Sequence, residues 1–572
     1  YRLKPFWFQQ PLPQYRAVEA SSFAWARMAV LQLALSISLW SSLAEPHSVE
    51  ALVHVGGTND NAAATIDLGW ELLVTSAGPE VPRTCFDAPG LPVWARGAFF
   101  ISGPALFEQG GFRFQSIFDG FGRSNRFELR GRQVCYTSRW LNTGAYEEAK
   151  AHNDLGQGVL FEDTKPKRPA CPLSHPMCNL MAPNDNNWVS MLEVGGEGVL
   201  LSDTHKMVRM DLDTMNCTGM KPWADDAKGS DPSAAQPDWV SKAHIPLAGS
   251  AHPLRRPGTH TWVDVLVEAP MVSGVMHSWV DLYTFEDTTA AKQLRKRIAS
   301  LKADANQYFH SFGVTPNYIV LPFNLMMKMP SLVSTPTLLG NFAPSWKGIH
   351  IVDYTGAVQV FDADAFFHTH IVNSFENGTG IVFDVGAYPS NPFSKGPALD
   401  IDLFLNKTAR DSQPVRGCVR RLHLHLSGPL RGKTTHEDFA APGRAVDFFK
   451  INMALSGLPY CIYYAVEWWH DGEAYASMAV LKHDLCKGTR KYWQRPNTYP
   501  GEPFFVPGVS GAEDDGAVMF IALDGARAHS IFVTLDARSF EELAVVELPV
   551  HIPFTAHGQF IPDANSAEKV IV

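Results

Sequence analysis

The sequence predicts an all-β protein in which many short strands follow one another within one large domain. The 572 residues include 44 Gly and 40 Pro, and 11% are aromatic, a composition that suits short strands and tight turns better than a helical bundle. From about Val93 onward, alternating or apolar runs are separated by Gly, Pro, Asn and Asp. No long linker divides these runs, so we expect a single β domain over residues 93–572.

The N-terminal region differs from this domain. Residues 28–44, MAVLQLALSISLWSSLA, are uncharged, too short for a bilayer span of about 20 residues, and end in the small-x-small triplet SLA. A signal or leader segment over residues 1–44 fits best, followed by a lead-in over residues 45–92. Upstream or fragment sequence and a buried hydrophobic helix are the alternatives. We therefore expect either the secretory pathway, with association with the ER membrane, or a plastid reached through an N-terminal signal.

Three hairpins are expected in the β domain. RFELRGRQVCYTSRW turns at Gly131, WVSMLEVGGEGVLLSD turns at Gly195-Gly196, and IVDYTGAVQVFDAD forms a third. One surface helix is predicted in TTAAKQLRKRIASLKADANQY, because Leu294, Ile298 and Leu301 recur at helical spacing.

Charge and short motifs exclude several classes of function. The net charge of −10 and the absence of a long basic run leave no footprint for a phosphate backbone, so nucleic acid is not an expected partner. There is no G-x-S-x-G elbow, Walker lysine loop or HExxH. Hydrolase and nucleotide-binding functions are therefore disfavoured.

The eight cysteines are too sparse for a disulfide scaffold. The closest pair, Cys171 and Cys178, lies in a Pro-rich insert, where a local disulfide or a simple loop is favoured over a zinc site completed by His175. Three N-x-T sequons, at Asn216, Asn377 and Asn406, are compatible with secretion.

Four histidines stand in or beside strand-like runs with Gly, Pro or Asn nearby. They are His252 in SAHPL, His310 in YFHSFGVTPNYIV, His370 in FFHTHIVNSFENG and His557 in FTAHGQF. Their wide spacing excludes a local metal motif but suits separate blades that each point one side chain toward a common axis. His423 and His425 share a strand face and are interpreted as solvated residues, since no third ligand is near them.

The segments around these histidines resemble the carotenoid cleavage oxygenase family, which includes the β-carotene oxygenases and the retinal pigment epithelium isomerohydrolase. YFHSFGVTPNYIVLPF is similar to the HSFG-x-T-x-NYIV stretch of that family, HIVNSFENG to its H-x-x-N motif, and IPFTAHGQF to its carboxy-terminal HG motif. GPALFEQGGFRFQSIFDGFG matches the opening of the fold. The resemblance covers roughly residues 93–562 in the order of the family.

The resemblance implies a seven-bladed β-propeller with a helical and loop cap over the iron face. It implies that Fe²⁺ is bound by four histidines that also form the catalytic centre, leaving two adjacent positions for oxygen. These residues are His252, His310, His370 and His557. At two positions, neighbouring histidines offer alternatives: His260 is the fallback for His252, and His370 is preferred to His368 because it alone has the Asn373 spacing.

Three acids of the family orient such histidines through their second ring N–H. They correspond to Asp203, Asp447 and Glu502. The first two are Asp where Glu is common in the family, so we expect the carboxylate to fall short by one methylene, a gap to be met by backbone movement or water. Strand-end or turn aspartates are the structural alternative.

The implied activity is O₂-dependent cleavage of a conjugated C=C bond in a carotenoid or apocarotenoid, giving aldehyde or ketone products. A hydrophobic polyene and O₂ are then the partners, with peripheral membrane contact expected. The alternatives are a retinyl-ester isomerohydrolase that uses the same iron as a Lewis acid and a carotenoid-binding propeller without turnover. The insert FEDTKPKRPACPL does not preserve the palmitoylated-cysteine pattern of the vertebrate isomerohydrolase, which favours cleavage.

Overall fold

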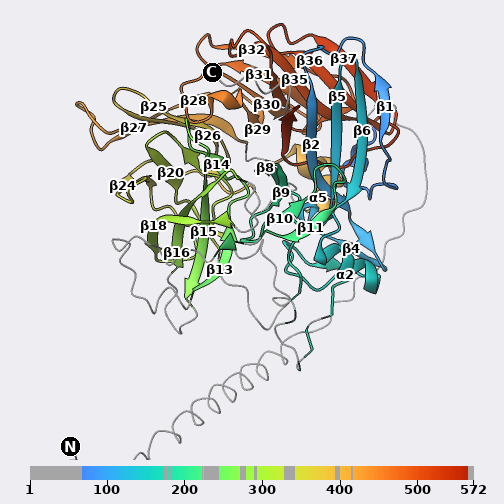
Figure 1. The fold of residues 1–572 in the computed structure, drawn as a ribbon, viewed down its shortest axis with the longest axis horizontal. Coiled ribbons are helices and arrows are strands. Elements are labelled where there is room, and N and C mark those ends of the chain that lie inside the picture. Colours follow the sequence, from blue (N-terminus) through green and yellow to red (C-terminus); the bar gives the residue numbers. More distant parts are fainter. Residues whose placement is uncertain are drawn as a thin grey trace, which may run out of the picture. The chain divides into compact units, whose positions relative to one another are not determined.

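The computed structural model describes residues 67–563, apart from residues 170, 173, 175–177, 179–181, 222, 225–243, 271–277, 289–292, 328–341, 393–399, 414–415 and 440. The expected leader over residues 1–44, and His175 of the zinc alternative, lie outside the described residues. No described helix is long and apolar enough to cross a membrane. Strands dominate the described chain, as the composition predicts (Figure 1).

Seven antiparallel sheets of four or five strands follow one another along the described chain. The first three blades are built from β1 (Thr84–Asp87), β2 (Gly97–Leu106), β5 (Phe121–Arg130), β6 (Gln133–Trp140) and β38 (Gly558–Pro562); β8 (Ser190–Val194), β9 (Glu197–Leu201), β10 (Val208–Met210) and β11 (Cys217–Met220); and β13 (His244–Gly249), β14 (Leu254–Arg255), β15 (Thr261–Pro270), β16 (Ser278–Glu286) and β18 (Lys296–Ala303).

The remaining four blades repeat the arrangement. They are built from β19 (Gly313–Val314), β20 (Tyr318–Pro322), β23 (Ile349–Asp353) and β24 (Val358–Phe361); β25 (Phe367–Glu376), β26 (Gly380–Tyr388), β27 (Cys418–His425) and β28 (Thr434–Phe439); β29 (Ala445–Lys450), β30 (Ile462–Trp468), β31 (Ala479–Asp484) and β32 (Thr489–Trp493); and β33 (Thr498–Pro500), β34 (Phe504–Pro507), β35 (Gly516–Asp524), β36 (His529–Asp536) and β37 (Glu542–Glu547). Consecutive small sheets of this kind form a seven-bladed β-propeller, which confirms the predicted fold class.

Short elements complete the described chain. The helices are α2 (Gly144–His152), α5 (Ile401–Leu405) and α6 (Lys407–Asp411), with 3₁₀ turns η1 (Trp70–Val74), η2 (Ile117–Asp119) and η4 (Met453–Leu455). The short strands are β3 (Glu108–Gln109), β4 (Phe112–Phe114), β7 (Thr164–Lys165), β12 (Trp223–Ala224), β17 (Gln293–Leu294), β21 (Leu325–Met327) and β22 (Phe342–Pro344).

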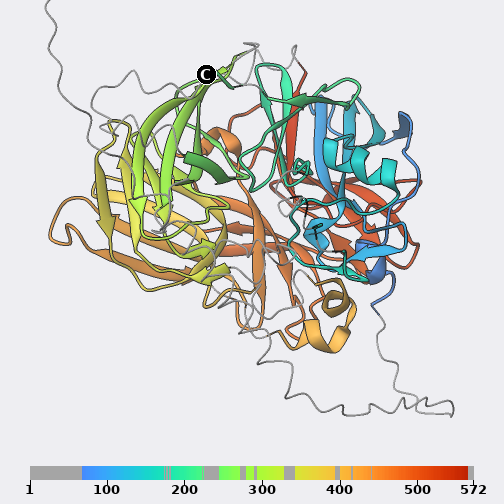
Figure 2. The ribbon, with the colours of Figure 1, turned by 90° about the horizontal axis from the view of Figure 1, so that it is seen from below.

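The last strand closes the first blade. β38 pairs with β2 from Gly97 opposite Pro562 to Ile101 opposite Gly558, and Figure 1 shows dark red and blue strands side by side. In Figure 2 the green strands of the third blade and the blue strands of the first lie on opposite sides of the described unit. Neighbouring blades meet through their first strands, since β19 contacts β25 and β25 contacts β29. The start of each blade therefore lies close to the starts of its neighbours.

The three predicted hairpins are confirmed as β5–β6, β8–β9 and β23–β24. In the first, Gly131 lies in the turn at φ 66°, a left-handed conformation that glycine adopts without steric cost.

The predicted surface helix is wrong. Its residues form β17 and β18, and β18 pairs with β16 as the outermost strand of the third blade. Ala299 and Ala303 are buried and Leu301 packs against the same core between them, so inward-facing residues recur at every second position. Leu294 is exposed. Arg297, within the segment expected to be helical, pairs with Asp281 at 3.4 Å. Pairing at a sheet edge outweighs the helical spacing of the apolar residues.

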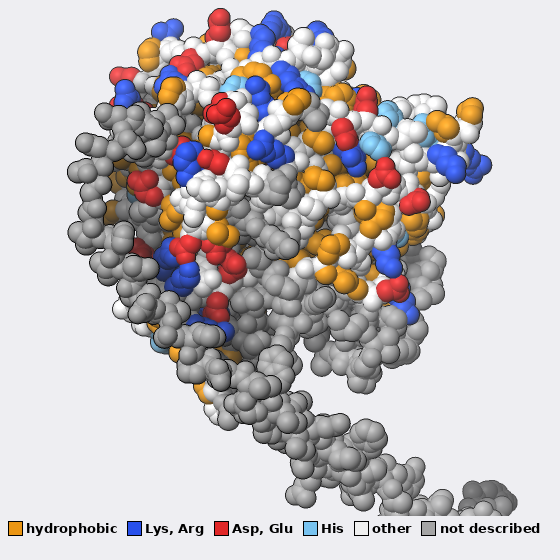
Figure 3. All heavy atoms as spheres, turned by 180° about the vertical axis from the view of Figure 1, so that it is seen from behind, with side chains coloured by type: hydrophobic (Ala, Val, Ile, Leu, Met, Phe, Trp, Pro, Cys, Tyr) orange, Lys and Arg blue, Asp and Glu red, His pale blue; other side chains and the backbone are white. Residues whose placement is uncertain are grey.

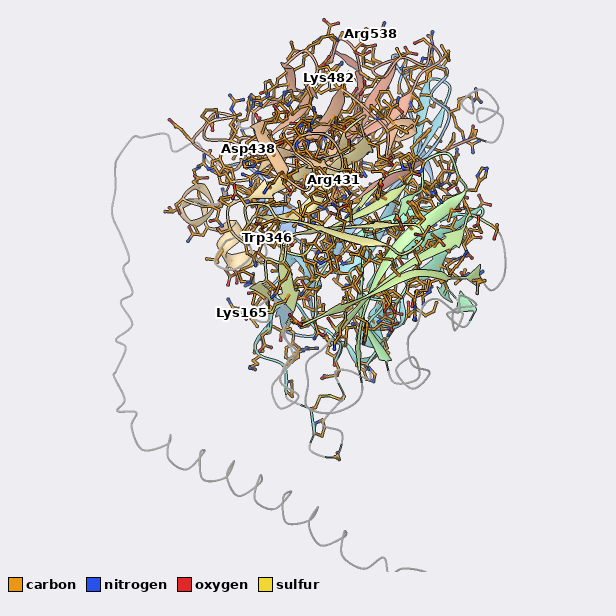
Figure 4. The ribbon with its side chains drawn as sticks, turned by 90° about the vertical axis from the view of Figure 1, so that its left-hand side faces the viewer. Lys165, Trp346, Arg431, Asp438, Lys482 and Arg538 are labelled. Atoms are coloured by element: carbon orange, nitrogen blue, oxygen red, sulfur yellow. A yellow bond between two sulfur atoms is a disulfide. The ribbon has the colours of Figure 1, made fainter. Side chains whose placement is uncertain are left out.

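Contacts between blades hold the ring together. Lys482 on β31, labelled in Figure 4, donates to Asp514 at 3.0 Å and to the carbonyl of Ala537 at 2.7 Å, so it ties the sixth blade to the seventh. On the face seen in Figure 3, acidic and basic side chains are interspersed.

Candidate metal centre

Each of the seven blades contributes one residue to a single cluster of histidines and acids. Blades one, three, four and five supply the histidines, and blades two, six and seven supply the acids. His370 and Asp447 lie on the first strands of their blades, and the others lie in loops that flank the strands of a blade. In blade order the residues are His557, Asp203, His252, His310, His370, Asp447 and Glu502.

The four histidines converge on one point. One ring nitrogen from each lies within 4.8 Å of the others. Nε2 of His310 is 3.1 Å from Nε2 of both His252 and His370, and Nε2 of His370 is 3.0 Å from Nε2 of His557. Two imidazole nitrogens that each lie about 2.1 Å from one ion, at a right angle, are separated by about 3.0 Å. The spacing therefore suits four ligands of one metal ion.

Three of the rings are oriented by carboxylates. Nδ1 of His310 lies 2.8 Å from Asp203, Nδ1 of His370 lies 2.7 Å from Asp447, and Nδ1 of His557 lies 2.7 Å from Glu502. An ionised carboxylate only accepts hydrogen bonds, so each Nδ1 carries the proton.

This tautomer leaves a lone pair on each of the three Nε2 atoms. His310 and His370 then face each other as two acceptors at 3.1 Å, as do His370 and His557 at 3.0 Å. Acceptors this close repel unless a cation lies between them. Burial, reinforced by the neighbouring histidines, holds the pKa of His252 and of His557 well below the usual value, which keeps both rings neutral. The residues present fit a bound cation.

The two aspartates reach their histidines directly, with no bridging group. Asp447 stands at a bulge of β29, and the next residue, Phe448, has a φ of 57°. The backbone thus departs from regular strand geometry at the position where the side chain is one methylene shorter than the usual Glu of the family. Oδ2 of Asp447 also accepts from the Tyr388 hydroxyl at 2.6 Å and from the Thr369 hydroxyl at 3.0 Å.

Asp203 has a similar arrangement. Its Oδ2 accepts from the Tyr308 hydroxyl at 2.6 Å while Oδ1 faces His310. Tyr308 and Tyr388 were not identified from the sequence. Tyr308 stands two residues before His310, but no such spacing relates Tyr388 to its partner.

Glu502 is supported differently. It accepts from the backbone N–H of Gly558 at 3.1 Å and pairs with Lys450 Nζ at 3.2 Å. Burial raises the pKa of Glu502, and Lys450 opposes that rise. Burial also acts to raise the pKa of Asp447, but His370, Tyr388 and the Phe448 N–H outweigh it and lower that pKa to about 2.

The charges of this cluster favour a divalent ion. Three carboxylates carry three negative charges, and Lys450 offsets one of them. A cation of charge +2 then neutralises a buried site that would otherwise hold uncompensated charge.

The alternative histidines lie elsewhere. His260 is exposed. His368 is buried, with Nδ1 2.7 Å from the Asn324 amide and Nε2 3.3 Å from the Ser311 carbonyl, so it has structural partners. His423 and His425 are half-buried on β27 with ring centroids 6.3 Å apart, and they are not part of the four-histidine cluster.

An aromatic ring adjoins the cluster. The Phe448 ring centroid lies 5.3 Å from that of His370 and 5.4 Å from that of His557, and Phe554 lies 6.0 Å beyond it. Sequence reasoning missed Phe448, because its place beside the histidines depends on the left-handed bulge.

Comparison with known proteins gives the class of this fold and site. A family model described as retinal pigment epithelial membrane protein matches residues 78–562. The chain therefore belongs to this family, the carotenoid cleavage oxygenase family that its motifs resemble.

Individual relatives share about a quarter of their residues with this chain. The mitochondrial carotenoid-cleaving dioxygenase of Mustela putorius furo is 25% identical over 82% of this chain and 92% of its own length. Carotenoid cleavage dioxygenase 8 homolog B, chloroplastic, of Oryza sativa subsp. japonica is 26% identical over 84% of this chain and 82% of its own. A cobalt-substituted Synechocystis apocarotenoid oxygenase has a similar fold, with a TM-score of 0.70 at 21% identity over 86% of this chain and 98% of that one.

Proposed function

We propose that this protein is an iron(II)-dependent dioxygenase that cleaves a conjugated C=C bond of a carotenoid or apocarotenoid with O₂, giving aldehyde or ketone products. The observation that carries the proposal is the convergence of four Nε2 atoms within 4.8 Å. The relatives are carotenoid-cleaving dioxygenases by name, which supports the class of substrate. We propose His252, His310, His370 and His557 as the iron ligands, with Asp203, Asp447 and Glu502 orienting three of them.

The chain's own residues prepare the site for this chemistry. The three carboxylates keep a proton on Nδ1 and a lone pair on Nε2, so each ring can bind iron without losing a proton first. Ferrous iron held by these four imidazoles would supply the activation of O₂. The Phe448 ring adjoins the rings of His370 and His557 and gives the cluster an apolar neighbour on that side.

One observation bears on the choice between cleavage and the isomerohydrolase alternative. Cys171, the cysteine of the divergent insert, is disulfide-bonded to Cys178 and is not free to carry an acyl chain. This favours cleavage over an isomerohydrolase built on the same histidines.

The expected peripheral contact with a membrane stays a prediction, which flotation with liposomes would test.

The test is aerobic incubation of the ferrous protein with β-carotene, a panel of apocarotenals, stilbenes and a retinyl ester, with products identified by mass. We expect aldehyde products that need O₂ and disappear in His310→Ala. His423→Ala, a histidine outside the cluster, is the matched control and should retain activity. Bound iron with no cleavage product would contradict the proposal: retinol released without O₂ would indicate the isomerohydrolase, and bound polyene without turnover would indicate a binding protein.

A further inference from the structure

Six of the eight cysteines are paired in disulfides. Cys85 on β1 lies directly opposite Cys135 on β6 in the first blade, and the two are bonded. Cys461, just before β30, is bonded to Cys486, just after β31, in the sixth blade. The third bond, Cys171–Cys178, closes the insert. Cys217 and Cys418 remain free.

Three separate pairs are unusual for a protein kept in a reducing compartment. Disulfides persist in oxidising compartments and are rare where glutathione keeps thiols reduced. The three pairs lie in different parts of the fold, so each requires its own two cysteines to be placed together. Together they indicate that the chain folds in an oxidising compartment.

The sequons supply an independent observation. All three sequon asparagines are exposed. Asn216 comes just before β11, Asn377 lies in the β25–β26 turn, and Asn406 comes just before α6. Each has Thr at the second position after Asn, and the residue between is not Pro.

The asparagine side chains leave their amide nitrogens available. In the β25–β26 turn, Oδ1 of Asn377 accepts from the N–H and the hydroxyl of Thr379 and from the N–H of Gly380. Oδ1 of Asn406 accepts from the Ala409 N–H at the start of α6. Only the oxygen is used in these bonds. Nδ2, the atom that a glycan would occupy, points to no partner among the described residues.

We propose that the chain matures in the oxidising, glycosylating lumen of the secretory pathway, where three disulfides form and Asn216, Asn377 and Asn406 receive N-linked glycans. In glycan transfer, Nδ2 attacks the anomeric carbon of a lipid-linked oligosaccharide. The new C–N bond replaces the bond to the pyrophosphate, which leaves with the lipid, and Nδ2 loses one proton. Each disulfide forms by exchange with a disulfide oxidant, which takes up two electrons and two protons from the thiol pair.

A glycan at Asn377 is compatible with the metal cluster. Asn377 follows the last residue of β25, whereas His370 lies near the start of that strand. Glu376, the last residue of β25, stands six positions after His370, a distance of about 20 Å at about 3.3 Å per residue. The modification therefore leaves the four-histidine cluster unobstructed.

The test uses the full chain secreted from a eukaryotic host behind a cleavable signal, with a cytosolic preparation as the reduced reference. Peptide mapping without reduction should recover three disulfide-linked pairs, and a peptide N-glycosidase, which hydrolyses the bond between the side-chain carbonyl carbon and Nδ2, should convert all three asparagines to aspartate. The triple variant Thr218→Ala/Thr379→Ala/Thr408→Ala should lose the glycans. The matched Thr→Ser triple variant should keep them, because it preserves each sequon.

Three results would overturn the proposal. Recovery of the three sequon peptides without glycans from the folded, secreted protein would contradict the proposed glycosylation. Alkylation of Cys85 and Cys461 without prior reduction would show that these cysteines are free thiols and would contradict the proposed disulfides. Equal thermal stability of the secreted and cytosolic proteins would show that the fold gains nothing from an oxidising compartment.

Discussion

Restoring the acid that is common in the family at position 447 should harm this protein. In Asp447→Glu the carboxylate moves outward by one methylene, about 1.5 Å. Asp447 is buried, and its two oxygens already accept four hydrogen bonds, from His370, Phe448, Thr369 and Tyr388 at 2.6–3.0 Å. A longer side chain must push against the His370 ring or the Tyr388 hydroxyl.

The expected cost follows from that packing. Adding a methylene to a filled site destabilises by about 1–3 kcal/mol. Disturbing an acid that orients a metal ligand lowers metal affinity by about 10–100-fold. We therefore expect Asp447→Glu to lower both the thermal unfolding temperature and the retention of iron against a chelator.

Two controls isolate the cause. Asp438→Glu changes an exposed aspartate, labelled in Figure 4, that pairs with Arg420, and it should leave both quantities unchanged. Adding Tyr388→Phe to Asp447→Glu removes the blocking hydroxyl and should recover part of the loss, a coupling that a double-mutant cycle measures. If Asp447→Glu alone holds iron and unfolds like the unchanged protein, the reasoning from packing is refuted.

Three further predictions concern the ligands, a disulfide and pH. His310→Ala should abolish stoichiometric iron binding by metal analysis while His423→Ala retains it, and equal iron in both would exclude His310 as a ligand. Cys461→Ser/Cys486→Ser opens a loop with a sequence separation of 25 and should cost about 3–4 kcal/mol in denaturant unfolding; no loss would show a bond without thermodynamic effect. Burial lowers the pKa of His483 to about 4, so the unfolded chain binds the extra proton between about pH 6.5 and 4, and stability should fall as pH falls through that window. His483→Gln should lose less stability there, and an unchanged pH profile would contradict this assignment.

Strand patterns predicted much of the fold because hairpin turns are local. Gly131 and the Gly195-Gly196 pair mark turns that the chain makes by itself. The helix prediction failed where tertiary pairing decides the outcome. Arg297 looks like part of a solvated helix until Asp281, from a neighbouring strand, is in place beside it.

In the site, too, residues marked by local sequence could be predicted, and residues placed only by tertiary contacts could not. The four histidines stand in recognisable segments and the three acids follow from the family resemblance, so all seven could be proposed from the sequence, and the structure brings them together. Tyr388 and Lys450 carry no such signal, because each meets its acid only through the order of the blades. Tyr388 ends β26 in the fifth blade, and its acid lies on β29 in the sixth.

Lys450 is the part of the site whose role depends on charge alone. Its Nζ lies 3.2 Å from Glu502, and Glu502 holds His557. If the cluster holds the proposed iron, removing the ammonium in Lys450→Met makes the net charge beside it more negative by one, which stabilises the ferric state over the ferrous state. We expect the midpoint potential of the iron to fall by tens of millivolts in a redox titration.

The charges can be removed separately or together. Lys450→Met/Glu502→Gln removes one charge of each sign and should return the potential toward its original value. Lys482→Met, a buried lysine that pairs with Asp514 in the outer part of the blades, is the matched control and should leave the potential unchanged. A potential that stays constant in Lys450→Met would show that the iron does not sense this pair. The balance of three acids, one ammonium and a divalent ion would then not govern the site.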